Sequence, residues 1–255
     1  MAKKKTSGSS QVIEIQAVTR GRAKFVIKGT SPLICNAMSS KAAQELLMPK
    51  PAGKARRTGL KHNPMQEFKD SMYVDDEADS PTLVTGLSAW FKAAMVEATV
   101  DMPDASKAAV GRNIWVDGER VHVYGIPRLF MSIVRSAGMN KTPDVRTRAI
   151  LPEWCCEITT SFAQPQIAPE AVMKLLGTAG IVMGVGDWRP QKGSGNYGQF
   201  EVVEESDSTV QRLMKDAGRQ QQVAALENPV AHDDETRKLL QWFEEELRAR
   251  DLKIA

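Results

Sequence analysis

Apolar and polar residues alternate along the first structured-looking stretch of the chain. The segment SQVIEIQAVTRGRAKFVIKGTSPL, residues 10–33, keeps this period of two on both sides of Gly21, which is typical of two half-buried strands joined by a tight turn. In the second strand Phe25 and Ile27 point to one face, because the side chains of a strand alternate between its two faces. The opposite face carries three cations, Arg22, Lys24 and Lys28. The pattern therefore predicts one core face and one basic face.

Three segments that follow have the spacing of helices. We expect helices within residues 39–48, 64–73 and 88–100, the first two with Ser or Pro at their starts, where these residue types are favoured. The third segment has an apolar stripe at helical spacing, formed by Trp90, Phe91, Ala94, Met95 and Ala98. We interpret this stripe as a core face.

Alternation returns in the second half of the chain. Residues 113–125, NIWVDGERVHVYG, place the pair Asp117-Gly118 between alternating residues, which predicts a hairpin. We further expect a strand over 152–163, a helix that begins after Pro169 and ends near Gly177 or Gly180, and a final strand over 197–205. Because few of these elements form β-α-β crossovers, the order favours an α+β fold built on an antiparallel sheet, with helical insertions and a glycine-rich loop.

The composition changes after Glu205. Residues 206–255 contain a glutamine-rich stretch and an amphipathic helix with Leu239, Phe243 and Leu247 in register. We interpret 1–10 as a disordered basic N-terminus, 11–205 as the body and 206–255 as a C-terminal helical appendage. The apolar stripe of the appendage must dock either on its own body or on a neighbouring subunit, where it would mediate oligomerisation.

Charge is distributed unevenly between these parts. From residue 204 onward twelve acidic and eight basic residues give −4, and because the whole chain carries +3, residues 1–203 carry +7. A basic part is suited to a polyanionic partner. The insertion at 41–82 includes a loop with Lys54, Arg56, Arg57 and Lys61. We interpret this loop either as a nucleic-acid contact or as a solvated linker.

The composition also argues against several classes of protein and site. No apolar run approaches the ~20 residues of a membrane helix, and the start MAKKKTSGSSQ has no apolar segment behind its lysines, so we expect a cytoplasmic protein with no membrane partner. The three cysteines lack CxxC spacing and the three histidines lie far apart, so we expect no disulfide, no metal ion and no cofactor. The acidic run at 75–79 is typical of a solvated loop.

A late segment combines glycines with aromatic and basic residues. GVGDWRPQKGSGNYGQF, residues 184–200, lacks the GxxxxGK of a P-loop, and Arg189 stands where a dinucleotide fingerprint needs its third glycine. Rings that stack on bases, beside cations that contact phosphates, suit a single nucleic-acid strand, and the loop offers Trp188, Arg189, Lys192 and Tyr197. The alternative is that Trp188 and Tyr197 pack on the core. Asp187 is either a functional carboxylate or holds the loop through Arg189 or backbone amides.

The order of a helix, this loop and a final strand resembles the C-terminal part of the RAMP superfamily, which includes backbone and processing subunits of CRISPR effectors. TLVTGLSAWFKAAM resembles the family's element in which a serine, here Ser88, precedes a helix containing a lysine, here Lys92. SPLI, RTR and the glycine-rich segment also resemble a group of bacteriophage proteins. Over residues 11–203, the resemblance implies a ferredoxin-like, RRM-like sheet that contacts RNA or a nucleic-acid hybrid, and subunits that polymerise along the strand.

We therefore expect a non-catalytic protein of phage or mobile-element origin that coats single-stranded RNA or DNA in the cytoplasm of a bacterial host and self-associates along the strand. Two alternatives stay open: a RAMP-type endoribonuclease that uses His62 or His122, and a virion assembly protein without a nucleic-acid ligand. The residues expected to line the strand are Arg22, Lys24, Lys28, Lys54, Arg56, Arg57, Lys61, Arg146, Arg148, Trp188, Arg189, Lys192 and Tyr197.

Overall fold

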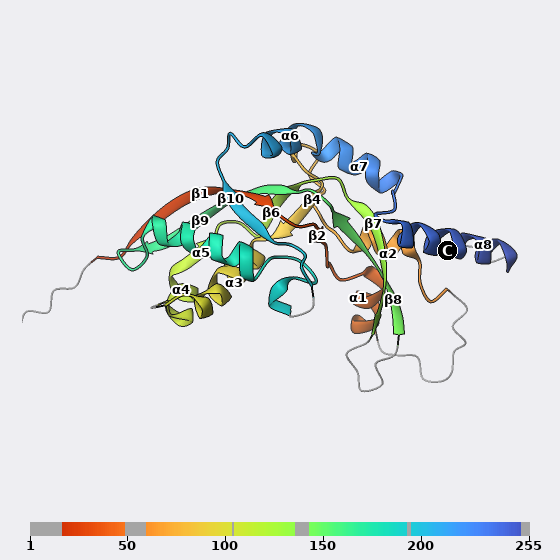
Figure 1. Cartoon of the computed structure of the whole chain (residues 1–255), viewed down its shortest axis with the longest axis horizontal. Coiled ribbons are helices and arrows are strands. Elements are labelled where there is room, and N and C mark those ends of the chain that lie inside the picture. Colours follow the sequence, from red (N-terminus) through yellow and green to blue (C-terminus); the bar gives the residue numbers. More distant parts are fainter. Residues whose placement is uncertain (1–16, 49–59, 104, 136–142, 193–194, 251–255) are drawn as a thin grey trace, which may run out of the picture.

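The chain forms two antiparallel sheets with helices packed against them, an α+β architecture with a curled main sheet (Figure 1). The structure is a computed structural model, and it describes residues 17–48, 60–103, 105–135, 143–192 and 195–250. Within these ranges, no helix has the length and apolar character needed to cross a membrane.

The larger sheet has seven strands in the order β10-β1-β9-β6-β4-β3, with β5 also paired to β9. Its longest pairing joins β1 to β9, from Thr19 opposite Gln164 to Lys28 opposite Cys155. The strands are β1 (Thr19–Gly29), β3 (Tyr73–Val74), β4 (Val84–Leu87), β5 (Ile114–Val116), β6 (Arg120–Tyr124), β9 (Cys155–Gln164) and β10 (Phe200–Val203).

The smaller sheet is a ribbon of three strands in the order β2-β8-β7. They span β2 (Leu33–Ile34), β7 (Arg128–Arg135) and β8 (Pro143–Leu151). Leu129 and Met131 of β7 are buried in the main core, so alternation sends Phe130 to the other face of the ribbon. The register places Phe130 opposite Arg148 and Ser132 opposite Arg146, which gives both arginines the same face as Phe130.

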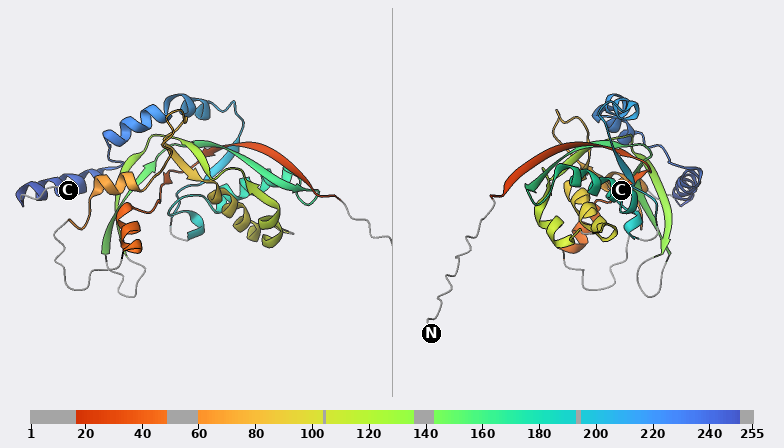
Figure 2. Two further views of the ribbon diagram at one scale, coloured as in Figure 1. Left: turned by 180° about the vertical axis from the view of Figure 1, so that it is seen from behind. Right: turned by 60° about the vertical axis from the view of Figure 1, so that its left-hand side comes forward.

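Helices cover both faces of the larger sheet. In Figures 1 and 2, α3, α4 and α5 lie on its concave side, whereas α6 and α7 lie on the opposite side, and α8 lies beside the β7–β8 ribbon. The helices are α1 (Ser40–Leu47), α2 (Pro64–Asp70), α3 (Ser88–Ala98), α4 (Lys107–Asn113), α5 (Pro169–Val182), α6 (Ser208–Asp216), α7 (Arg219–Glu227) and α8 (Asp234–Ala249), with short 3-10 turns η1 (Thr99–Asp101) and η2 (Pro190–Lys192).

The central strands are buried on both faces, which explains the adjacent cysteines. Cys156 packs in the main core with Ile27, while Cys155 and Val26 face a second cluster completed by α6. Burial raises the pKa of the Cys155 thiol to about 12 and that of Cys156 well above its ordinary value. Both thiols therefore stay protonated and unreactive.

Several sequence expectations are confirmed. Helices α1, α2 and α3 lie within 39–48, 64–73 and 88–100, and the final strand appears as β10. The strand expected over 152–163 is β9. Cys156, Ile158 and Phe162 of β9 face the main core, and Trp154, directly before the strand, packs there too.

The turn expected at Gly21 is wrong, because Gly21 lies inside β1. A Cβ at this position would overlap the ring of Phe162 on β9. The residue is therefore a glycine because of close packing between neighbouring strands rather than because of a turn. Most of the strand expected before Gly21 lies outside the described residues.

The hairpin expected over 113–125 is also wrong. β5 and β6 do not pair with each other; both pair with β9, one after the other along its edge. The Asp117 carboxylate at the interruption accepts hydrogen bonds from Arg22 and Ser161. Asp117-Gly118 thus marks a break in one edge of the sheet. The helix α5 also runs past Gly177 and Gly180, to Val182.

The C-terminal helices dock on the body of the same chain. Val210 and Leu213 of α6, and Ala217 directly after it, cover Val26 and Cys155. Leu239 of α8 packs against the main core, and Leu247 is buried. Of the two docking surfaces considered for the apolar stripe of α8, its own body and a neighbouring subunit, these residues contact their own body. The division of the chain at 205 stays a prediction, and the N-terminus at 1–10 lies outside the described residues.

Candidate nucleic-acid interface

Backbone hydrogen bonds join the glycine-rich loop to β2 and to the residue before it. Asp187 N–H donates to the carbonyl of Ile34 at 3.0 Å and Gly198 N–H to that of Pro32 at 2.8 Å. Gly186 and Gly198 have φ of +78° and +69°, a left-handed conformation that glycine adopts without strain. A Cβ at Gly186 would lie 2.6 Å from the Ile34 carbonyl oxygen. The glycines therefore allow a close approach of two backbones.

Trp188 and Tyr197 pack around Phe130. Their ring centroids lie 5.9 and 6.4 Å from that of Phe130, and 6.1 Å from each other. Ile34 and Ile150 complete this small apolar cluster. Both loop rings are half-buried, so each is supported by the cluster while part of it faces solvent.

Arg148 lies opposite Phe130 in the β7–β8 pairing and beside Asp187 of the loop. Its Nε is 3.7 Å from Asp187 Oδ2 and makes no hydrogen bond to the described residues. Burial lowers the pKa of the Arg148 guanidinium, and the Asp187 carboxylate opposes that shift. The other oxygen of Asp187 accepts the Trp188 N–H at 3.1 Å. Asp187 therefore contacts Arg148 of β8 and a backbone amide of its own loop. Of the two partners expected from the sequence, Arg189 and backbone amides, the second is found.

Four further cations lie on this side of the molecule. Arg189 donates to the Gly186 carbonyl at 2.8 Å and to Gln191 at 2.9 Å, while Arg128, Arg146 and Lys192 are exposed. No acidic side chain of the described ranges lies within ion-pair distance of these four. We call the whole surface the β8–loop surface; it comprises Arg128, Phe130, Arg146, Arg148, Trp188, Arg189, Lys192 and Tyr197.

The basic face of β1 has a different setting. As expected from the sequence, Arg22, Lys24 and Lys28 lie on one face of β1. Each of them, however, contacts at least one carboxylate. Arg22 lies 2.7 Å from Asp117, Lys24 2.7 Å from Glu157, and Lys28 2.8 Å from Glu201 and 2.9 Å from Asp207. Hydrogen bonds to these carboxylates raise the pKa of both lysines. The charge of this face is largely compensated, and its part in binding stays a prediction.

The basic loop of the insertion is only partly described. Lys54, Arg56 and Arg57 lie outside the described residues. Lys61 lies 2.6 Å from Asp144 of β8. A role of these four residues in binding stays a prediction.

The histidines that the endoribonuclease alternative would use are engaged within the fold. His62 Nδ1 lies 2.9 Å from Glu67 and its Nε2 lies 3.1 Å from Asp144. His122 Nδ1 lies 3.2 Å from the Thr82 hydroxyl. Among the described residues, no group of His, Cys, Asp or Glu is arranged to hold a metal ion.

Three residues beside the β8–loop rings were missed in the sequence. Arg128 and Phe130 belong to β7, which the sequence interpretation left without an element. His232 packs edge-on against Phe130 with centroids 5.7 Å apart, and burial lowers the pKa of His232. PRLFMSIVR, residues 127–135, is a short and mainly apolar run that begins after a proline, which is a pattern consistent with a buried strand.

Comparison with known proteins gives a likeness in structure but none in sequence. No protein-family model and no curated protein matches the sequence. The chain is similar in structure to Cmr6 from Pyrococcus furiosus, with a TM-score of 0.34 and 9% sequence identity, over 72% of this chain and 99% of Cmr6.

Proposed function

We propose that this protein binds single-stranded RNA or DNA at the β8–loop surface without cleaving it, and that it self-associates along the strand. The observation that carries the proposal is the contrast between two basic surfaces. The cations on β1 are compensated by carboxylates. Those on the β8–loop surface, next to three aromatic rings, have a single carboxylate of the described residues within ion-pair distance, that of Asp187, which lies beside Arg148.

The chemistry of this surface suits an unpaired strand. Exposed arginine and lysine side chains contact phosphates, and the accessible parts of Trp188 and Tyr197 offer faces for bases that have left a stack. The half-buried rings are held by Phe130, so little side-chain entropy is lost on binding. Because the contacts involve phosphates and ring faces, we expect little sequence preference.

The fold is compatible with the proposal. We interpret the order β10-β1-β9-β5/β6, with α3 and α5 as the intervening helices, as a ferredoxin-like β-α-β-β-α-β unit, and this interpretation supports the proposal. We include in the proposal a RAMP-like relationship, a phage or mobile-element origin and a cytoplasmic place of action in a bacterial host.

The contacts of His62 support a binding role without catalysis. A general base needs a ring nitrogen free to accept a proton from the substrate, whereas both nitrogens of His62 already face carboxylates. We therefore assign His62 a structural role that joins the start of α2 to β8.

Fluorescence anisotropy with short labelled RNA, DNA and duplex oligonucleotides tests the proposal. We expect single strands to bind more tightly than the duplex and to remain intact. Trp188→Ala should weaken binding by about 1–3 kcal/mol, roughly 5- to 150-fold, through the loss of one stacking face.

Trp242→Ala is the matched control, because Trp242 is an exposed tryptophan on α8, outside the β8–loop surface. It should bind short oligonucleotides like the wild type. Strand cleavage that disappears in His62→Ala would support the endoribonuclease instead, and absence of binding to any oligonucleotide would support a virion assembly protein.

A further inference from the structure

Trp115 of β5 shares a face of the larger sheet with the cations of β1. It pairs with Ser161 of β9, which in turn pairs with Arg22, and directly paired residues point to the same face. In Figures 1 and 2, α6 and α7 lie over this face near β4 and β6, and no described helix lies over the end of the sheet formed by the start of β1 and the end of β9. Thr19 pairs with Gln164, the last residue of β9, so from Arg22 to its start β1 leads away from Trp115.

Two cations from different elements lie near the Trp115 ring. The guanidinium carbon of Arg20 is 5.6 Å from the ring centroid, and the ammonium nitrogen of Lys92 on α3 is 5.9 Å from it. Both distances are close to the limit of roughly 6 Å for a cation–π contact, so both side chains can turn from the ring towards a phosphate. We call Trp115, Arg20 and Lys92 the Trp115 site.

The positive charge of this site is not compensated by the described residues. Neither cation has a described carboxylate within ion-pair distance. The acidic residues nearest in sequence to the ring and to the lysine have partners of their own. Asp117 accepts hydrogen bonds from Arg22 and Ser161, each at 2.7 Å, and Glu97 lies 2.6 Å from Lys107. The site therefore keeps two positive charges beside an accessible ring.

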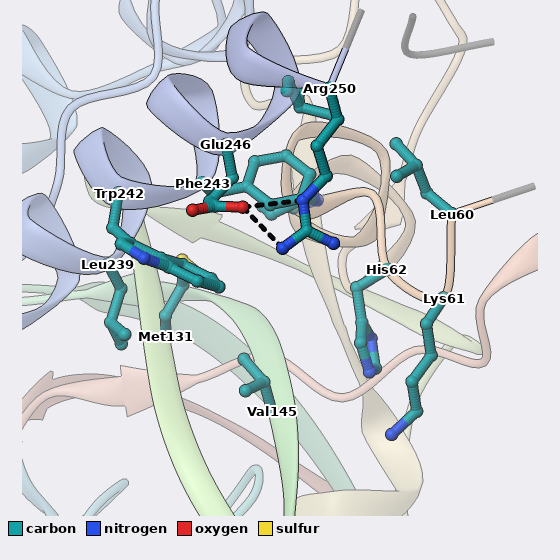
Figure 3. A pocket seen from close by; sticks show the side chains of 12 residues that line it. Leu60, Lys61, His62, Met131, Val145, Leu239, Trp242, Phe243, Glu246 and Arg250 are labelled. Carbon is teal, nitrogen blue, oxygen red and sulfur yellow. Dashed lines mark hydrogen bonds and ion pairs between the residues drawn. The ribbon is translucent and has the colours of Figure 1, made fainter. Parts of the chain in front are cut away.

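The other exposed tryptophan has a different setting. Of the five tryptophans, Trp115 and Trp242 are exposed, to 37% and 59%. Trp242 and Met131 line an apolar pocket of about 280 Å³ beneath α8. Figure 3 shows Arg250 beside this pocket in contact with Glu246, at 2.6 Å. The Trp115 site thus combines an exposed ring with free positive charge, whereas the charge of Arg250 is compensated.

We propose that the Trp115 site is a second contact for single-stranded nucleic acid, in which a base stacks on Trp115 and neighbouring phosphates bind Arg20 and Lys92. A ring and two cations match the two repeating parts of a strand, its bases and its phosphates. The base must be unpaired, because a base within a duplex has no free face for the ring. The inference rests on the proposed function, since both sites recognise the same chemistry.

The Trp115 site and the β8–loop surface lie far apart on one copy. In Figure 1 the start of β1 and the end of β9 lie towards one end of the molecule, and β8 lies towards the other. One copy can therefore hold two short strands, or two segments of one long strand. The Trp115 site has fewer rings and fewer cations than the β8–loop surface, so we expect it to be filled second, at higher concentrations of the strand.

Equilibrium titration of the full chain with a short single strand counts the sites. The wild type should take up two strands per chain in two steps. Trp115→Ala should weaken the second step at least about fivefold, through the loss of the stacking face, and leave the first step unchanged. Trp115→Phe keeps an aromatic face and should retain most of the second step. Arg20→Ala with Lys92→Ala, an independent variant of the same site, should reduce the salt dependence of the second step.

Trp242→Ala is the matched control and should keep both steps. A wild type that binds one strand per chain, more weakly in Trp188→Ala but unchanged in Trp115→Ala, would overturn this inference and leave the proposed function in place. One strand per chain that is lost in Trp115→Ala but kept in Trp188→Ala would support the Trp115 site and remove the β8–loop surface. Absence of binding at every concentration of the strand would overturn both.

Discussion

At the residue scale, the glycine-rich loop depends on positions that admit no side chain. Gly198 has φ of +69°, and a Cβ there would overlap the Val185 carbonyl oxygen. We predict that Gly198→Ala lowers the free energy of unfolding by at least about 2 kcal/mol, from left-handed strain plus the steric conflict. Chemical denaturation measures this loss.

Gly177→Ala is the control for that substitution. Gly177 lies inside α5, where a Cβ meets nothing within 4 Å, so alanine should raise stability by about 0.5–1 kcal/mol. Equal effects of the two substitutions would show that the loop backbone does not need its glycines.

The sequence could identify Trp188 and Arg189 as site candidates because their motif is local. It could not distinguish a turn glycine from a packing glycine at Gly21, since the ring that requires the glycine belongs to Phe162, far along the chain. The sequence also could not show the role of Gln222, because its partners are likewise distant along the chain. It lies in a glutamine-rich stretch, yet it is fully buried and its side chain bonds to backbone groups of β4 and β6.

At the element scale, α6 is attached to the sheet through its N-cap. Asp207 accepts hydrogen bonds from Thr209 N–H at 2.9 Å and Val210 N–H at 3.1 Å, and Lys28 lies 2.9 Å away. The bond from Lys28, followed by that from Val210 N–H, lowers the pKa of the Asp207 carboxyl below its ordinary value. The folded state therefore favours the ionised carboxylate.

This shift predicts a dependence of stability on pH. A carboxyl whose folded pKa lies below its unfolded value contributes stability that is present above the unfolded pKa, about 3.9, and is lost as pH falls through the folded pKa. Asp207→Asn keeps a good N-cap but removes the charge. We expect the difference in melting temperature between wild type and Asp207→Asn to be largest near neutral pH and to vanish in acid. A constant difference across the titration would contradict the Lys28 pairing as its source.

The strands β7 and β8 show where element prediction fails. β8 carries the RTR motif that the sequence singled out, but no strand was expected there or over β7, so their pairing was not foreseen. The hairpin expected at Asp117-Gly118 failed for a related reason: local turn chemistry was present, yet β9 offered both segments a better partner. Sheet pairing depends on residues distant in sequence, which periodicity alone does not reveal.

At the scale of the whole molecule, the C-terminal helices complete the fold while leaving the β8–loop surface open. The α6 side chains cover Val26 and Cys155, and Gln222 of α7 joins two strands of the larger sheet. The amphipathic spacing of α8 was predictable from sequence, but the surface that receives it was not, because that surface forms only when the β7–β8 ribbon is in place.

The salt dependence of affinity for a short single strand tests the proposed binding surface most directly. Arg146 and Lys192 are exposed on that surface, so Arg146→Ala with Lys192→Ala should reduce the slope of log affinity against log salt by about 0.7 for each phosphate that is no longer neutralised. Arg22→Ala with Lys24→Ala removes as much charge from the compensated β1 face and should leave the slope near that of the wild type. A slope that falls only in the Arg22 and Lys24 variant would contradict the proposal. It would show instead that the nucleic acid binds at the basic face of β1.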